Sequence, residues 1–149
     1  MNNNLKILIK RLDKDAQLPR FAHATDAGAD LLSTEDKVLQ PGERALIGTG
    51  LALAIPNGYG AFVQPRSGLA IKHGISMVNT PGTIDAGYRG ELKVILINHD
   101  TKEPFTVAKG DRIAQLVIQK VEQPLFEETD TLPEADRGDN GFGSTGKNG

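Results

Sequence analysis

Closely spaced glycine and proline turns divide the chain into short strand-like runs, and this division constrains the fold more than any other feature. The turn signals are Pro41-Gly42, Pro56-Asn57-Gly58, Pro81-Gly82 and Lys109-Gly110-Asp111. Between them, alternating or short apolar runs dominate and helical periodicity is scarce. Many short strands joined by such turns predict an all-β, jelly-roll-like sandwich or barrel.

We expect six of these runs to be strands, at 5–11, 44–55, 59–64, 92–98, 105–107 and 112–121. Run 92–98 has the clearest pattern, because it is rich in β-branched residues. Gly48 and Gly50 lie inside run 44–55 and predict a bulge or bend there. One short helix is expected at 67–72, with Ser67 as the residue that caps its start.

The 149 residues suit one domain with a real core. We assign 1–132 to that core domain. From residue 133 the chain reads PEADRGDNGFGSTGKNG, which is too polar and Gly-rich to bury much apolar area. We therefore expect 133–149 to form a flexible C-terminal arm. Phe142 is the only large aromatic side chain of this arm, and it needs a surface on which to stack.

Charge and cysteine content narrow the classes of partner. The formal net charge is -2, which argues against a protein that binds nucleic acid duplexes. The absence of cysteine excludes disulfides and thiolate metal sites. Neither a signal peptide nor a run of transmembrane length is found, so the expectation is a soluble, cytoplasmic protein with no membrane partner.

The Gly-rich arm matches G-x-G-x-x-G at 141–146, but only three residues follow Gly146. That motif requires a preceding strand and a following helix, so a Rossmann or Walker site is rejected. Bare backbone N–H groups, together with Arg137, Ser144 and Thr145, could still wrap a phosphate. The alternative is a solvated, disordered tail.

Three other stretches carry candidate site residues. Arg66, Ser67 and Gly68 offer a guanidinium fork, a hydroxyl and an open backbone to a phosphate, although an ordinary strand-to-helix turn has the same residues. Asp26 and Asp30 could hold magnesium or could form Asx turns. Gln115 interrupts an apolar run and is either a buried amide that demands partners or a solvent-facing side chain.

Asp85 follows Ile84 directly after the Pro81-Gly82 turn and precedes the strand at 92–98. A carboxylate in this place either caps a turn or takes part in chemistry. The residues next to Asp85 do not by themselves decide between these two roles. The other candidate stretches must be considered together with them.

Taken together and in order, these stretches resemble the five motifs of the trimeric dUTP nucleotidohydrolases (dUTPases). The motifs are Ala27-Gly-Ala-Asp-Leu31, Pro65-Arg-Ser-Gly-Leu-Ala70, Gly82-Thr-Ile-Asp-Ala-Gly-Tyr-Arg-Gly-Glu91, Gly110-Asp-Arg-Ile-Ala-Gln115 and Arg137-Gly-Asp-Asn-Gly-Phe-Gly-Ser-Thr-Gly146. The resemblance implies a β-clip type jelly-roll subunit, a homotrimer with sites built from more than one subunit, and hydrolysis of dUTP to dUMP and pyrophosphate with Mg²⁺. Such an enzyme supplies dUMP for dTMP synthesis and keeps uracil out of DNA.

The resemblance also implies a role for each candidate residue. Asp85 would orient and deprotonate a water that attacks the α-phosphorus. Tyr88 would exclude a 2′-hydroxyl, and Lys93 would border the substrate through its backbone. The residues that would read uracil are Asn79, Gly82, Thr83 and Ile84.

The phosphates would lie on Arg66, Ser67, Gly68 and Gln115, with Asp30 near the magnesium through water. The arm would close as a lid in which Phe142 stacks on uracil. Its contacts to the γ-phosphate would come from Arg137, Gly143, Ser144 and Thr145.

Two alternatives remain at this point. One is a dCTP deaminase, or a bifunctional deaminase and dUTPase, of the same superfamily. The Gly82–Tyr88 pattern and the aromatic Gly-rich arm argue against it. The other is a non-enzymatic trimeric module that binds nucleotides, which an intact Asp85 argues against.

Overall fold

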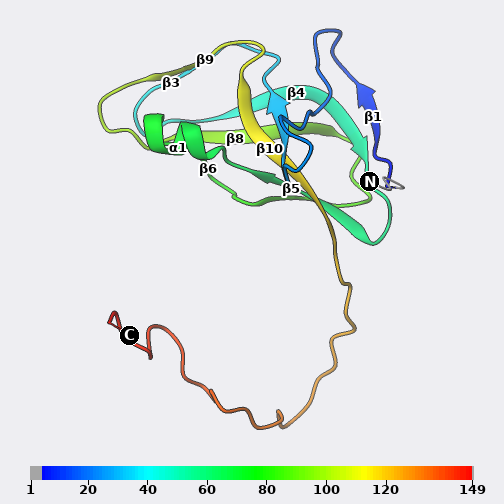
Figure 1. The fold of residues 1–149 in the computed structure, drawn as a ribbon, viewed down its shortest axis with the longest axis vertical. Coiled ribbons are helices and arrows are strands. Elements are labelled where there is room, and N and C mark those ends of the chain that lie inside the picture. The colour runs from blue at the N-terminus through cyan, green and yellow to red at the C-terminus, as the bar shows by residue number, and fades with distance from the viewer. Residues whose placement is uncertain (1–4, 149) are drawn as a thin grey trace.

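Two four-stranded antiparallel sheets account for most of the structure, as the pattern of short runs predicts. The computed structural model describes residues 5–148. The strands are β1 (Leu8–Arg11), β2 (Ala29–Leu32), β3 (Lys37–Leu39), β4 (Arg44–Ala54), β5 (Tyr59–Gln64), β6 (Ile75–Met77), β7 (Gly82–Ile84), β8 (Glu91–Asn98), β9 (Phe105–Val107) and β10 (Arg112–Lys120). The first sheet has the order β1-β4-β8-β6, the second has the order β2-β10-β5-β7, and β3 pairs with β9 (Figure 1).

The inner faces of the two sheets share one apolar core. Ile47 and Val94 from the first sheet belong to the same buried cluster as Val63 and Leu116 from the second. Strand β8 alternates buried and less buried positions, because successive side chains point to opposite faces of a sheet. Each large apolar side chain buried in this way stabilises the fold by about 1.5–3 kcal/mol.

The predicted all-β class with one short helix is confirmed, and the strand boundaries differ only locally. The expected first strand starts at Leu8 instead of residue 5. Strands β2, β3, β6 and β7, each three or four residues long, were not predicted, whereas the equally short β9 was. The bend expected at Gly48 and Gly50 is present, since the register of β4 against β8 shifts between Gly48 and Ala52 and Gly50 has a φ of 68°.

The expected cap of the helix was wrong. Helix α1 (Ser67–His73) begins at Ser67, and its N-cap is Arg66 in an extended conformation without a side-chain hydrogen bond to the helix. The Ser67 hydroxyl is therefore on the first helical residue and exposed to solvent. At the other end, Gly74 adopts a φ of 66° and donates to the carbonyls of Ala70 and Leu69.

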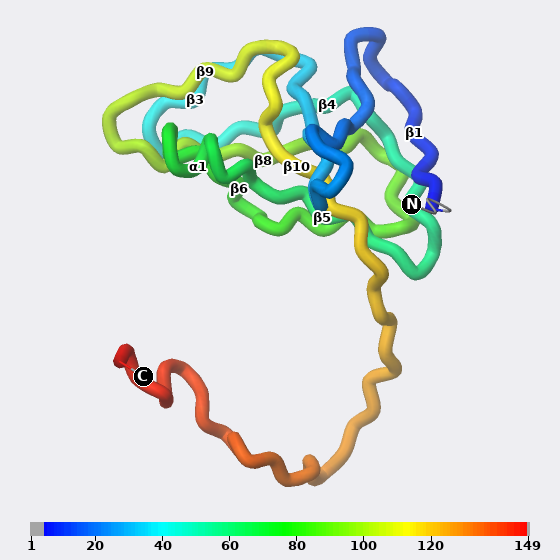
Figure 2. Tube along the Cα trace, in the orientation of Figure 1, coloured from blue at the N-terminus to red at the C-terminus, as the bar shows by residue number. Residues whose placement is uncertain are grey.

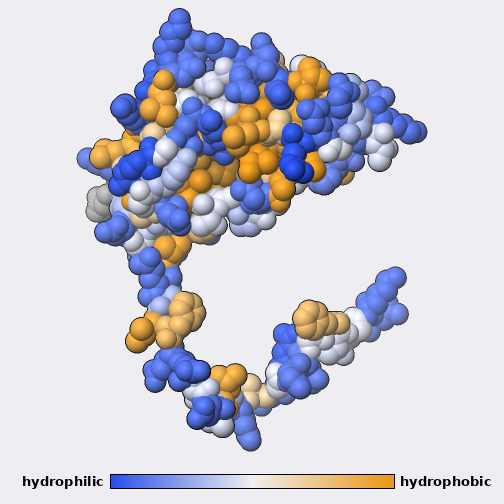
Figure 3. Space-filling model, turned by 180° about the vertical axis from the view of Figure 1, so that it is seen from behind, coloured by the Kyte–Doolittle hydropathy of each residue, from blue (hydrophilic) through white to orange (hydrophobic). Residues whose placement is uncertain are grey.

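After β10 the chain leaves the body and runs into solvent (Figures 1 and 2). Residues 122–140 are exposed throughout, so the extended stretch begins before the predicted arm boundary at 133. Three of its apolar side chains, Leu125, Phe126 and Leu132, are 91%, 91% and 84% exposed, and apolar groups stand out along the arm in Figure 3. Among the described residues, no helix is long and apolar enough to span a membrane.

Candidate active site

Asp85 lies where the chain crosses from one sheet to the other. Strand β7 pairs with β5, whereas β8 pairs with β4 and β6, so residues 85–90 form a crossover turn between the sheets rather than the tip of a paired hairpin. The Tyr88 N–H donates to the Asp85 carbonyl at 3.1 Å. The Arg89 guanidinium donates to the carbonyls of Ala86 at 2.6 Å and Tyr88 at 3.0 Å. The turn therefore holds Asp85 at an exposed, well-defined position.

A cavity of about 590 Å³ lies beside this turn and is called the crossover cavity below. Thr83, Ile84 and Asp85 line it from β7 and the turn, and Tyr59 and Phe62 line it from β5. Its volume lies in the range of small-molecule sites. An exposed carboxylate thus stands at a mixed apolar and polar cavity.

Strand β7 is an edge strand of its sheet. An edge strand presents a row of N–H and C=O groups that no neighbouring strand uses. Asn79 precedes this strand, and its Nδ2 lies 3.4 Å from the position that a β-carbon on Gly82 would take. The side-chain amide of Asn79 is therefore next to the free backbone edge.

A second cavity, of about 310 Å³, is called the cradle. It brings together five of the predicted residues with Arg112 and the 22–28 loop; the five are Asp30, Arg66, Ser67, Gly68 and Gln115. They come from β2, β10 and the start of α1. These donors leave a concave, cation-rich surface that suits an anion.

Gln115 is half-buried and hydrogen-bonded, so its amide is not simply on a solvent face. Its Nε2 donates to the Pro65 carbonyl at 2.9 Å. A β-carbon on Gly28 would lie 2.2 Å from Gln115 Oε1, so only glycine leaves room for the amide here. Gly28 therefore leaves the space that the Gln115 amide occupies in the cradle, and the bond to Pro65 holds the amide there.

Asp30 joins the two guanidinium groups of the cradle. Its Oδ1 lies 3.3 Å from Arg66 Nε and its Oδ2 lies 3.6 Å from Arg112 Nη1. Arg66 also donates to the Arg112 carbonyl at 3.3 Å. Asp26 instead accepts the His23 N–H at 2.9 Å and stabilises a turn. Of the two acids considered for magnesium, only Asp30 is part of the charged network.

A family model described as dUTPase matches residues 14–146. The chain belongs to the dUTPase family. It is 59% identical over 142 residues to the deoxyuridine 5′-triphosphate nucleotidohydrolase of Thermobifida fusca (strain YX), covering 95% of this chain and 79% of that protein. It is 56% identical over 147 residues to the protein of that name in Corynebacterium glutamicum, covering 99% of each chain.

Solved dUTPase structures share the fold. A point mutant of the dUTPase of Staphylococcus bacteriophage 80alpha with dUpNHpp superposes with a TM-score of 0.88 at 33% identity, covering 95% of this chain and 98% of that one. A dUTPase from phage phi11 of S. aureus, described with a structural Mg(II) ion, gives a TM-score of 0.79 at 29% identity, covering 85% and 98%.

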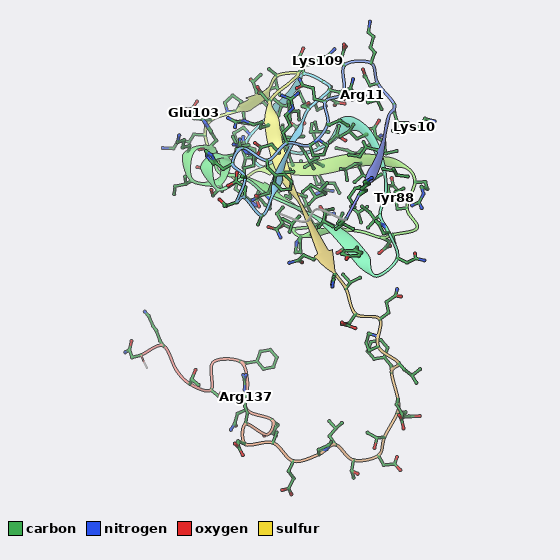
Figure 4. The ribbon with its side chains drawn as sticks, turned by 45° about the vertical axis from the view of Figure 1, so that its right-hand side comes forward. Lys10, Arg11, Tyr88, Glu103, Lys109 and Arg137 are labelled. Carbon is green, nitrogen blue, oxygen red and sulfur yellow. The ribbon has the colours of Figure 1, made fainter. Side chains whose placement is uncertain are left out.

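In this dUTPase most of the predicted site residues fall into three groups, whereas Asn79, Gly82, Tyr88 and Lys93 line neither cavity. The cradle and the crossover cavity share no lining residue. The arm forms the third group. Phe142 is fully exposed and Arg137 Nε donates to the Asn140 carbonyl at 2.7 Å within the arm itself. Figure 4 shows Arg137 far from Tyr88 and the body. Gly143, Ser144 and Thr145 lie in the same extended arm.

The geometry gives little support to the predicted roles of Lys93 and of a metal ion. Lys93 lies exposed on β8 with its Nζ 4.0 Å from Glu91 Oε2, and it lines neither the cradle nor the crossover cavity. Over residues 5–148, no group of three or more acidic or histidine side chains gathers to hold a metal ion. Asp30 as an acid near magnesium stays a prediction.

Arg112 is the cradle residue that sequence reasoning missed. In a regular strand, residues three apart point to opposite faces, so a regular β10 would not bring Arg112 and Gln115 into one cavity. The register of β10 against β2 shifts between Arg112 and Ala114. This irregularity turns both side chains to the same side. In the sequence, only the position of Arg112 inside the Gly110–Gln115 motif could have indicated that its side chain lies in the cradle.

Proposed function

We propose that this dUTPase is a dUTP diphosphatase that hydrolyses dUTP to dUMP and pyrophosphate. A water attacks the α-phosphorus, the bond from this phosphorus to the bridging oxygen breaks, and pyrophosphate leaves. The observation that carries the proposal is the Asp85 carboxylate, held by the crossover turn at the crossover cavity in a chain of this family.

Asp85 is the proposed general base. A carboxylate is a weak base, so most of its effect comes from holding the water in line with the leaving pyrophosphate. The backbone bond between Tyr88 and Asp85 and the two Arg89 bonds restrict the turn that directs the carboxylate. Removal of the negative charge therefore removes the base without removing the cavity.

Uracil selection is assigned to the free edge of β7 together with Asn79. Backbone donors cannot flip, so a base with the wrong pattern leaves them unpaired, which can discriminate by roughly 10⁴-fold. Tyr88, 46% exposed, follows the base-reading strand and would pack against the sugar. A ring in that place leaves no room for a 2′-hydroxyl.

The cradle is the proposed site for the phosphates. Arg66, Ser67, Gly68 and Gln115 supply donors, and Arg112 adds a second guanidinium. Magnesium carried on the triphosphate would neutralise phosphate charge, and Asp30 is the cradle carboxylate that could meet its water shell. Support for magnesium comes from the phi11 dUTPase described with a structural Mg(II) ion.

A homotrimer is proposed as the assembly that completes each site. Within one chain, the crossover cavity and the cradle share no residue, and the arm extends away from the body (Figure 1). Different subunits would then supply the general base Asp85, the phosphate donors of the cradle and the arm that forms the lid. The arm would close over a bound triphosphate, with Phe142 on uracil and Arg137, Gly143, Ser144 and Thr145 on the γ-phosphate.

The test is pyrophosphate release with magnesium for dUTP, dTTP, dCTP and UTP, with wild-type protein and Asp85→Asn. We expect release from dUTP alone with the wild type, and dUTP binding without hydrolysis in the variant. Ammonia released from dCTP would identify a deaminase instead. Hydrolysis by Asp85→Asn at the wild-type rate would refute the assigned base.

A further inference from the structure

We propose that the Asn140-Gly141 peptide in the arm is a site of spontaneous deamidation, and that this modification disables the arm. The chemical part of the inference stands on the sequence and geometry of the arm. Its consequence for activity rests on the proposed function of the arm as a lid.

The reaction needs only water. The Gly141 backbone nitrogen loses its proton and attacks the side-chain carbonyl carbon of Asn140, and ammonia leaves with the amide nitrogen. The resulting cyclic imide is then opened by water at either of its two carbonyls. The product at position 140 is aspartate or isoaspartate, so that one water is consumed and one ammonia is released. Glycine favours the attack because no β-carbon crowds its nitrogen.

The arm leaves both partners of this reaction free to meet. Asn140 is exposed, and nothing lies within 4 Å of the position that a β-carbon on Gly141 would take. Among residues 5–148, no hydrogen bond engages the Asn140 side-chain amide or the Gly141 N–H. The segment also lacks strand or helix structure, so the side chain can reach the attack geometry.

Arg137 adds a specific activating contact. Its Nε donates to the Asn140 carbonyl at 2.7 Å, and this carbonyl belongs to the same peptide unit as the Gly141 nitrogen. When that nitrogen loses its proton, the negative charge spreads onto the carbonyl oxygen. A cationic donor on this oxygen stabilises the anion, as a donor in an oxyanion hole does. The residue proposed to bind the γ-phosphate therefore promotes the modification.

The chain carries its own control in Asn57-Gly58. This pair forms the turn between β4 and β5, where the Tyr59 N–H donates to the Pro56 carbonyl at 3.1 Å and the Val121 N–H donates to the Gly58 carbonyl at 3.0 Å. Asn57 and Gly58 must leave this turn before they can reach the geometry of attack, which costs conformational free energy. We therefore expect Asn57 to react roughly tenfold more slowly than Asn140. The third pair, Asn148-Gly149, includes a residue outside the described structure.

Either product would impair a phosphate-binding lid. Aspartate places a negative charge beside Arg137, where it competes with the triphosphate for the guanidinium. Isoaspartate also routes the backbone through the side chain, which changes the spacing between Arg137 and Phe142. Conversion of Asn140 should therefore lower turnover without affecting the folded body.

The first experiment follows deamidation in the full-length protein at mildly alkaline pH by peptide mapping and mass spectrometry. We expect Asn140 to convert roughly tenfold faster than Asn57. Arg137→Gln should slow conversion at Asn140 and leave Asn57 unchanged. Equal rates at the two sites would overturn the inference, and an unchanged rate at Asn140 in Arg137→Gln would overturn the activating role of Arg137.

The second experiment compares the decay of dUTP turnover during the same incubation, each protein relative to its own fresh rate. Gly141→Ala is the matched variant, because Gly141 has no left-handed φ and no close neighbour. Wild-type turnover should fall in step with conversion of Asn140, whereas Gly141→Ala should hold its rate. Undiminished turnover of converted wild-type protein would overturn the assigned consequence. Turnover of fresh wild-type protein tests the proposed function separately.

Discussion

The ring of Tyr88 occupies the space that a β-carbon on Gly90 would fill. Such a carbon would lie 2.5 Å from Tyr88 Oη, 2.7 Å from Cζ and 3.0 Å from Cε2. The Tyr88 hydroxyl donates to the Glu91 carbonyl at 2.9 Å, which holds the ring in this position at the exposed crossover turn (Figure 4). The orientation of the ring thus depends on the absence of a side chain at Gly90.

Gly90→Ala is expected to weaken the discrimination between dUTP and UTP. The added methyl displaces the Tyr88 ring, and a displaced ring leaves room for a 2′-hydroxyl. We expect the ratio of kcat/KM for dUTP to that for UTP to fall by about tenfold, which corresponds to about 1.4 kcal/mol. Steady-state kinetics with both nucleotides measures this ratio.

Gly87→Ala is the matched control, because it lies in the same turn and nothing is within 4 Å of the added β-carbon. Its ratio should match that of the wild type. In a Tyr88→Ala background, Gly90→Ala should change the ratio no further, since no ring remains to be displaced. A wild-type ratio in Gly90→Ala alone would contradict the assignment.

Asp30→Asn should weaken the cradle even where no metal is involved. The carboxylate forms ion pairs with Arg66 at 3.3 Å and with Arg112 at 3.6 Å. Because all three side chains are partly exposed, each pair contributes about 0.2–1 kcal/mol. We expect kcat/KM for dUTP to fall by about tenfold.

The metal dependence separates the two possible roles of Asp30. If Asp30 mainly orients the guanidinium groups, the magnesium concentration that gives half-maximal rate stays the same in Asp30→Asn, and Arg112→Gln lowers kcat/KM in a similar way. A large increase in the magnesium requirement of Asp30→Asn alone would instead assign it to the metal. Titration of the rate with MgCl₂ at fixed dUTP measures this difference.

Deletion of 137–149 is expected to nearly abolish turnover while the folded body and its proposed trimeric assembly survive. Residues 137–148 make no contribution to the buried core, so loss of the arm should cost the body little stability. Ordering the arm costs about 1–2 kcal/mol per residue of backbone, which the contacts to a full triphosphate must offset. Pyrophosphate release measures the loss, and light scattering checks the assembly. A truncated protein with the wild-type rate would rule out the lid.

Features of the fold and the site that depend on neighbouring residues could be predicted from the sequence, whereas those that depend on contacts between distant segments could not. Strand β8 was predictable because its β-branched residues, Val94, Ile95 and Ile97, mark an extended run. Strand β3 was not, because its three residues become a strand only by pairing with β9, some seventy positions away. A carboxylate directly after a turn is ambiguous, so Asp85 was singled out by the resemblance of Gly82–Glu91 to a dUTPase motif. Arg112 was missed because the β10 irregularity, a tertiary feature, turns it into the cradle.

Asp100 should make the stability of the fold sensitive to acid. Its Oδ1 accepts the N–H groups of Glu103 at 2.9 Å and Lys102 at 2.8 Å, and its own N–H donates to Oδ1 of the buried Asn98 at 2.9 Å. The backbone bond from Glu103, and then that from Lys102, lower the pKa of Asp100 below its ordinary value of 3.8. The charged form is therefore favoured in the folded state.

Because the pKa is lowered on folding, the stabilisation is fully present above the ordinary value of 3.8 and is lost as the pH falls through the folded-state pKa. Asp100→Asn keeps an oxygen acceptor but has no proton to gain in this range. We expect the free energy of unfolding of the wild type to fall more steeply than that of Asp100→Asn as the pH decreases below this value. Urea unfolding at a series of acidic pH values measures both profiles, and parallel profiles would show that Asp100 makes no such contribution.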